Sequence, residues 1–278
     1  SVVSDPEDYA TVANTCLKKN IFYDFGMPWL GQGLLTEPLE KWNIHRRLIN
    51  PAFNQAVLDG FIGIFNSQHR RSVKNLEDNV GKGPYIHRNA LETICLAALG
   101  TDLSDETKQN NEYMLAVDKI LSIFVDRLQK IWLYPDFIFN LTSKKKKQDK
   151  YVEILHHLSN SVSPKFKPFM DLLLELSIEK KLFNDTEIRE HVDTIIAAGY
   201  ETNADTFVYT ILLIASFPDV QEKIVEELID VFGNDVRDVT KQDLSKLIYL
   251  EAVIKESMRY FPVVPVTART LDRDVKLR

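Results

Sequence analysis

Residues 185–217 read DTEIREHVDTIIAAGYETNADTFVYTILLIASF and form the longest helical pattern in the chain. Asn184 and Glu187 have the spacing of a capping box at its start. Pro218 follows Phe217 and disfavours helical backbone at that residue. The sequence therefore predicts one continuous helix, which at 1.5 Å per residue is about 50 Å long and crosses a whole domain.

Polar residues interrupt this apolar segment at Ala198-Gly199-Tyr200-Glu201-Thr202. A glycine in mid-helix costs about 1 kcal/mol relative to alanine, and the polar side chains beside it compete with the backbone for hydrogen bonds. One interpretation is that Gly199 leaves a gap for a flat ligand, with Glu201 and Thr202 beside it. The alternative is that Gly199 marks close helix packing and Glu201 faces solvent, and the segment alone leaves both open.

A second pattern lies in a helix predicted over about residues 241–260, where Glu256 and Arg259 stand three apart. Such acid–base pairs occur on many exposed helices and contribute only about 0.2–0.5 kcal/mol, so a surface pair is the simpler interpretation of this one alone. Its position is more informative, because it follows Thr202 by 54 residues and precedes a segment with Pro262, Pro265 and Arg269.

A third pattern places Trp42 and Arg46 four residues apart, on one face of a predicted helix. An indole N–H and a guanidinium are suitable donors to a carboxylate, which arginine can hold bidentately. The alternative is an amphipathic helix whose arginine lays its stem along apolar surface.

Composition narrows the function classes. The net charge of −6 argues against a nucleic-acid binder that depends on phosphate contacts. The one basic run, Lys144–Lys147, is predicted to be a solvated loop, with contact to a membrane surface or partner as the alternative. The longest apolar stretch, residues 207–217, is shorter than the roughly 20 residues that span a bilayer, and no signal peptide opens the sequence.

Cysteines and histidines give no metal-binding spacing. Cys16 and Cys95 are far apart, which indicates neither a disulfide framework nor a zinc knuckle. Adjacent His156 and His157 point to different helix faces, and we predict that they are polar surface residues. The six histidines form no spaced cluster, so the sequence assigns no metal ligand; they stand at positions 45, 69, 87, 156, 157 and 191.

The chain as a whole is predicted to be mainly α with a minor β component, in one partial domain over residues 1–278. Val2–Val3 and the alternating residues 274–277 are the candidate strands. No internal repeat is present. The central helix over about 185–217 and the helix over about 241–260 are its best-marked elements.

Taken in order, these motifs resemble those of the haem-thiolate monooxygenases, the cytochrome P450 family, and look closest to its microsomal, insect-like fatty-acid hydroxylases. The resemblance covers nearly the whole chain and implies a cytochrome P450 fold that is incomplete at both ends. The family's N-terminal membrane anchor and its Phe-x-x-Gly-x-Arg-x-Cys loop do not occur in this sequence. Neither Cys16 nor Cys95 has the surroundings of that loop, so the axial iron ligand is assigned to neither.

The resemblance also implies roles for residues. Haem b would be the cofactor, with its propionates bound by Trp42, Arg46 and Arg269. Ala198 and Gly199 would lie against the haem. Members that esterify their haem carry glutamate where Ala198 stands, so non-covalent binding is expected.

For the remaining motif residues the resemblance implies proton handling and support. Thr202, with Glu201 as its acidic neighbour, would organise proton delivery to dioxygen. Glu256 and Arg259 would be structural residues.

The function implied is an oxidoreductase of the monooxygenase type, which inserts one oxygen atom from O₂ into an apolar small molecule such as a fatty acid, hormone-like lipid or xenobiotic. Its electrons would come from an NADPH-dependent reductase, at the cytosolic face of the endoplasmic reticulum membrane, with no nucleic acid involved. One alternative is a non-catalytic, truncated helical protein that cannot hold haem by thiolate. Another is isomerisation or dehydration of hydroperoxides, against which Glu201 and Thr202 speak, because such members tend to lose this pair.

Overall fold

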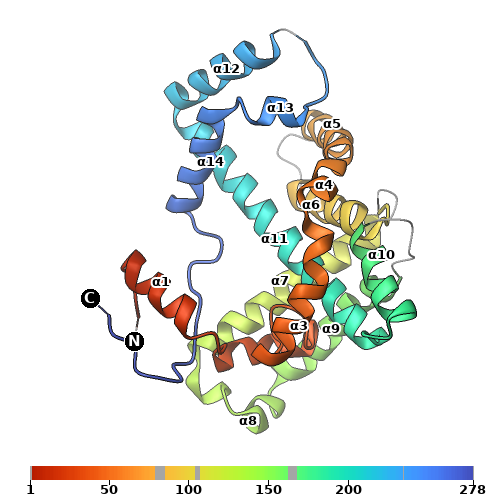
Figure 1. Cartoon of the computed structure of the whole chain (residues 1–278), viewed down its shortest axis with the longest axis vertical. Coiled ribbons are helices and arrows are strands. Elements are labelled where there is room, and N and C mark those ends of the chain that lie inside the picture. The colour runs from red at the N-terminus through yellow and green to blue at the C-terminus, as the bar shows by residue number, and fades with distance from the viewer. Residues whose placement is uncertain (1, 79–84, 104–106, 162–167, 234, 278) are drawn as a thin grey trace.

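The computed structural model describes residues 2–78, 85–103, 107–161, 168–233 and 235–277, and helices dominate it (Figure 1). In these residues the only β pairing is an isolated antiparallel bridge between Lys19 and Arg269. The prediction of a mainly α chain is confirmed. The strands predicted at Val2–Val3 and at residues 274–277 are wrong, because neither segment lies beside a partner strand in the described part of the chain.

The first half of the chain contains α1 (Pro6–Thr15), η1 (Ile21–Gly26), α2 (Met27–Leu30), α3 (Leu39–Ile49), η2 (Asn50–Phe53), α4 (Gln55–Gly60), α5 (Ile62–Asp78), α6 (Tyr85–Ile94), the π-helical turn η3 (Cys95–Leu99), α7 (Thr107–Gln129) and η4 (Ile131–Leu133). The second half contains α8 (Asp136–Asn140), α9 (Ser143–Ser161), α10 (Pro168–Leu174), the π-helical turn η5 (Glu175–Glu179), α11 (Asp185–Ser216), α12 (Pro218–Phe232), α13 (Lys241–Leu244) and α14 (Ile248–Tyr260).

The central helix forms as predicted. The Asn184 side chain accepts from the Glu187 backbone N–H, the Glu187 carboxylate accepts from the Asn184 N–H, and the helix ends at Ser216 before Pro218. Figure 1 shows α11 running from the large helical body toward α12 and α14. One helix therefore connects the large helical body to the group formed by α12 and α14 (Figure 1).

The core lies where α6, α7, α9 and α10 gather around the N-terminal half of α11. Its fully buried members come from all five helices and include Leu91, Tyr113, Leu155, Phe169 and Ile196. Among the described residues, no helix is long and apolar enough to cross a bilayer.

Two local predictions are wrong for identifiable reasons. The single helix expected over about 241–260 is interrupted after Leu244. A second capping box, of Thr240 and Asp243, begins the short α13, and α14 starts separately at Ile248, where the Glu227 carboxylate accepts from the N–H groups of its first turn. The Lys144–Lys147 run is helical and belongs to α9. Two of its lysines are paired, Lys144 with Asp126 of α7 and Lys145 with Asp149, so acidic neighbours offset part of the repulsion in the run.

Two contacts fasten the C-terminal part of the chain. Thr210 of α11 donates to the Ser257 hydroxyl of α14 over 3.1 Å, and Tyr209 stacks on Phe261. The segment after α14 then returns beside α1, where Thr270 N–H donates to Lys18 O over 2.8 Å (Figure 1).

Candidate functional site

The connection between α2 and α3 lies directly on α11. Gly33 permits this approach, because a Cβ there would stand 2.1 Å from the Thr194 hydroxyl and 2.5 Å from the Glu190 carbonyl oxygen. Gly31 adopts φ +52°, and its carbonyl accepts from Thr36 Oγ1 over 2.7 Å. The loop thereby fixes the start of α3, which carries Trp42 and Arg46, against the first half of α11.

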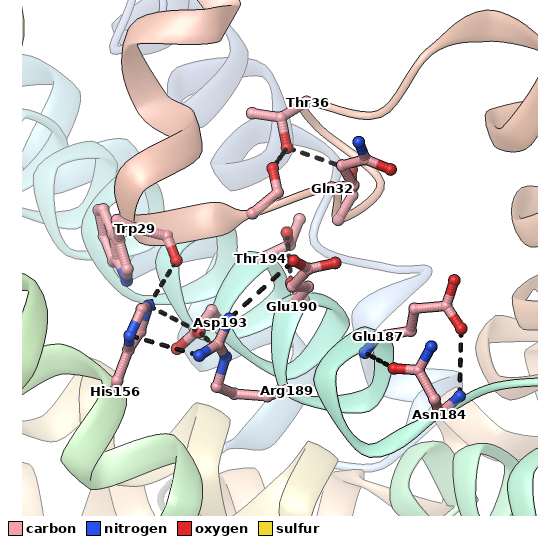
Figure 2. Close-up of polar contacts among 12 residues, drawn as sticks. Trp29, Gln32, Thr36, His156, Asn184, Glu187, Arg189, Glu190, Asp193 and Thr194 are labelled. Atoms are coloured by element: carbon pink, nitrogen blue, oxygen red, sulfur yellow. Dashed lines mark hydrogen bonds and ion pairs between the residues drawn. The ribbon is translucent and has the colours of Figure 1, made fainter.

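A buried acid, Asp193 of α11, lies where α9 and α2 pack on this helix. Figure 2 shows His156 of α9 and Arg189 directed toward Asp193, and each has a nitrogen 3.7 Å from the same Asp193 oxygen. Burial raises the pKa of the fully buried Asp193 carboxyl to about 7. His156 Nε2 donates to the Trp29 carbonyl over 2.8 Å. The prediction of a surface role is therefore wrong for His156, whereas His157 is exposed.

Ala198 and Thr202 share the open face of α11. Ala198 is exposed and Thr202 half-buried, and the Thr202 hydroxyl donates to the Ala198 carbonyl one turn back. A small apolar side chain with a hydroxyl one turn beyond it therefore lies on an accessible helix surface. Farther along α11, Phe207, Ile211 and Leu212 are also exposed, so the C-terminal half of the helix presents apolar surface.

Gly199 does not leave a gap for a ligand. A Cβ at this position would lie 2.7 Å from Cδ1 of Ile94 on α6. The missing side chain thus makes room for a neighbouring helix, and the packing alternative accounts for the glycine. If a flat group lies against this part of α11, Ala198 is the residue whose side chain is free to touch it.

Glu201 is half-buried and lies with two other titratable groups. Its carboxylate, His87 of α6 and Asp205 offer ligand atoms that all lie within 4.8 Å of one another, and His87 Nε2 is 3.1 Å from Asp205. Burial, and then the charge of Asp205, raise the pKa of Glu201, while His87 opposes the shift. The interpretation of Glu201 as solvent-facing is wrong. No sequence pattern pointed to His87, because this residue comes from α6, more than one hundred positions before Glu201.

The three propionate candidates differ in burial. Trp42 is half-buried against the core, and Arg46 is exposed. Among the described residues, neither the Trp42 indole nor the Arg46 guanidinium takes part in a hydrogen bond or an ion pair. Arg269 is half-buried, and its Nε has no hydrogen-bond partner there, while Nη1 donates to the Ala268 carbonyl over 3.0 Å.

The β-bridge between Lys19 and Arg269 brings Arg269, the third propionate candidate, toward the start of α3. Lys19 Nζ donates to the carbonyls of Leu34 and Glu37, the second of which directly precedes the Pro38 cap of α3. Residues more than two hundred positions apart are thus in one neighbourhood. Among the described residues, the Arg269 guanidinium donates only to Tyr23 and Ala268, so no hydrogen bond joins it to Trp42 or Arg46.

Glu256 and Arg259 pair as their spacing predicts. Arg259 donates to both carboxylate oxygens of Glu256 over 2.7 Å, which is the bidentate arrangement. Their side chains are 61% and 68% exposed, so the pair lies on the surface of the described chain. A pair this exposed contributes little to stability by itself.

Neither cysteine has the character of an iron ligand. Cys16 and Cys95 are fully buried. Burial raises the pKa of the Cys95 thiol to about 12, and that thiol lies in the core at the π-helical turn after α6. A thiolate is therefore strongly disfavoured at Cys95.

Comparison with known proteins defines the class of this domain. The family model for cytochrome P450 matches residues 2–278, so the chain belongs to the cytochrome P450 family. Cytochrome P450 4c3 of Drosophila melanogaster is 34% identical over 98% of this chain and 58% of its own length. Human cytochrome P450 4V2 is 33% identical over 94% of this chain and 55% of its own length, and cytochrome P450 4c21 of Blattella germanica is 33% identical over 99% and 61%. The chain therefore spans 55–61% of the length of these relatives.

Members of this family hold their haem iron through a cysteine thiolate. The residues present fit part of that requirement. Ala198 presents an uncovered methyl group, and Arg269 holds a buried N–H without an acceptor that a propionate oxygen would satisfy. The exposed Arg46 supplies a second cation. Gly199 contributes no space, because Ile94 already occupies it.

Proposed function

We propose that this chain is the part of a monooxygenase that carries its oxygen-activating helix. The whole protein would insert one oxygen atom from O₂ into an apolar small molecule, with electrons from an NADPH-dependent reductase. The observation that carries the proposal is the open face of α11 at Ala198 and Thr202 in a chain whose family binds haem.

Haem, when bound, supplies the iron at which dioxygen is reduced. We assign Trp42, Arg46 and Arg269 to its propionates, since each offers an N–H donor that has no competing carboxylate among the described residues. Ala198 would contact the ring. Glu256 and Arg259 would be structural, although the described chain leaves their pair exposed.

Thr202 and Glu201 would handle protons. The Thr202 hydroxyl is anchored on the Ala198 carbonyl, which orients its oxygen along the open face of α11. The raised pKa of Glu201 lets its carboxyl retain a proton at higher pH than an exposed glutamate. His87 and Asp205 border this carboxyl and would supply a path for its protons from the surface.

The finer assignments rest on the family resemblance. A fatty acid, hormone-like lipid or xenobiotic is proposed as substrate, since the sequence looks closest to fatty-acid hydroxylases. We place the protein on the cytosolic face of the endoplasmic reticulum membrane.

Replacing Thr202 with alanine in the haem-loaded, full-length protein is expected to uncouple the reaction. Removing one positioned proton-handling group should lower product formed per NADPH by about 100-fold, with NADPH consumption largely retained. The measurement is the ratio of product to NADPH consumed.

Thr206→Ala is the matched control, since Thr206 donates to the Thr202 carbonyl in the same one-turn manner. Its coupling should stay close to that of the wild type. Unchanged coupling in Thr202→Ala, or equal loss in both variants, would contradict the role of Thr202.

A further inference from the structure

A buried cluster of three potential ligands lies between α3 and α11. Glu37 directly precedes the cap of α3, His45 lies within that helix, and His191 lies in the first half of α11. The two histidines are 146 positions apart in sequence. Their exposed fractions are 1% for Glu37, 6% for His45 and 0% for His191, so solvent does not satisfy these groups.

The three side chains converge on one point. His45 Nδ1 is 2.8 Å from Glu37 Oε2 and 3.1 Å from His191 Nε2. A ring nitrogen carries either one hydrogen or one lone pair, so His45 Nδ1 can make a good hydrogen bond to only one of these neighbours. Despite the short distance, both Glu37 oxygens lack a partner with hydrogen-bond geometry, and so does His191 Nδ1.

Burial shifts all three groups toward their neutral forms: it lowers the pKa of His45, lowers the pKa of His191 to about 3 and raises the pKa of Glu37 to about 7. Each neutral imidazole carries one lone pair, and the Glu37 carboxyl would release its proton on binding an ion. Phe183 contacts both rings edge-on, with centroids 4.7 and 5.1 Å away, and holds them in an apolar setting. Buried acceptors without donors are costly, and a cation at this point would take one lone pair each from Glu37 Oε2, His45 Nδ1 and His191 Nε2.

We propose that Glu37, His45 and His191 bind a divalent transition-metal ion of the zinc class, separate from the haem. Two imidazoles and one carboxylate are a ligand set that zinc uses, with a fourth position left for water. At metal–ligand distances of about 2.0–2.1 Å, tetrahedral ligand atoms lie about 3.3 Å apart, so the two separations from His45 Nδ1 need to widen by at most about half an ångström, and all three ligand atoms already lie within 4.8 Å of one another.

The charges around the cluster also suit a cation. The positive charges near the cluster are those of Lys19 and Lys41. The carboxyl groups there are those of Glu37, Glu187 and Glu190. Lys41 is paired with Glu187 over 2.8 Å, and Lys19 Nζ donates to backbone carbonyls, so both lysine charges are partly engaged. A bound ion would tie the start of α3 to α11 and stabilise the folded chain by an amount that rises with the logarithm of the metal concentration once this exceeds the dissociation constant.

Zinc titration of the full, metal-stripped chain tests the site, with a chromophoric chelator as competitor. The wild type is expected to bind one equivalent. Glu37→Gln and His191→Gln should bind at least about 100-fold more weakly, because losing a ligand costs more than losing a group behind it. His69→Gln is the matched control, since His69 is exposed on α5 and bonds only its own helix, and it should bind like the wild type.

A second readout does not depend on the competitor. Zinc should raise the unfolding temperature of the wild type and of His69→Gln, but not of Glu37→Gln, and Co²⁺ should give the visible absorption of a tetrahedral site. Glu37→Gln is nearly isosteric, so it decides the matter if His191→Gln does not fold. Wild-type binding no tighter than that of the triple variant Glu37→Gln/His45→Gln/His191→Gln would overturn the proposal, as would equal loss in His69→Gln. None of these readouts requires haem or turnover.

Discussion

Replacing Arg127 with methionine is expected to lower the free energy of unfolding by about 3 kcal/mol. Arg127 is 4% exposed and lies at the end of α7. Its Nε donates to the Leu133 carbonyl over 2.9 Å, and its Nη2 donates to the Tyr134 carbonyl over 3.0 Å. Methionine fills a similar volume but leaves both carbonyls of this turn without their donors.

Aromatic contacts add to the expected loss. The guanidinium carbon lies 4.1 Å from the ring centroid of Phe25 and 4.3 Å from that of Phe139, so one cation holds together η1, α7 and α8. The ion pair with Asp136 contributes little, because the Asp136 side chain is 83% exposed. Urea unfolding followed by circular dichroism measures the difference.

Arg70→Met provides the comparison. Arg70 pairs with Asp238, and the two side chains are 64% and 51% exposed, so this change should cost less than about 1 kcal/mol. Similar losses in the two variants would show that the buried hydrogen bonds of Arg127 do not support the fold.

Gly33→Ala is expected to destabilise the chain by about 3 kcal/mol. The added Cβ would lie 2.1 Å from Thr194 Oγ1 and 2.5 Å from the Glu190 carbonyl oxygen. The threonine side chain can turn away, but the carbonyl belongs to the backbone of α11 and cannot. The loop would have to move off the helix, and unfolding by heat or urea measures the cost.

Two further variants sharpen this prediction. Gly63→Ala, in α5, meets nothing within 4 Å and should be neutral or stabilising by up to about 1 kcal/mol. The double variant Gly33→Ala/Thr194→Ala should recover only part of the loss, because the Glu190 carbonyl remains. Full recovery would mean that the threonine alone sets the approach of the loop.

The central helix was predictable because the residues that start and stop it are neighbours in sequence of its first and last turns. Asn184 and Glu187 carry the capping box within four residues, and Pro218 stops the helix beside its last turn. The Lys144–Lys147 run was misassigned because only part of its charge compensation is local: Lys145 pairs with Asp149 in the same helix, but Asp126, which pairs with Lys144, lies on α7. Local signals thus determine helix ends well, whereas pairing across helices is invisible in a single segment.

The candidate site shows the same division. The spacing of Ala198 and Thr202 places them on one face of a helix, and the structure keeps both on an open surface. The sequence could not decide whether Gly199 makes room for a ligand or for a neighbouring helix, because Ile94, which packs against it, comes from α6. The cluster of Glu37, His45 and His191 depends on how the α2–α3 connection packs on α11, and no sequence spacing reports that contact.

The most direct test of the proposed haem contact is Ala198→Glu in the haem-loaded, full-length protein. If the open face of α11 meets haem at this position, a carboxylate there should become esterified to the ring during turnover, as in family members that carry glutamate at this site. Haem would then stay with the protein after denaturation and solvent extraction. Asn203→Glu is the matched control, because Asn203 is exposed five residues farther, about 140° around the helix. Retention in Ala198→Glu alone is the predicted result, and fully extractable haem in both variants, or equal retention in both, would contradict the placement of haem at Ala198.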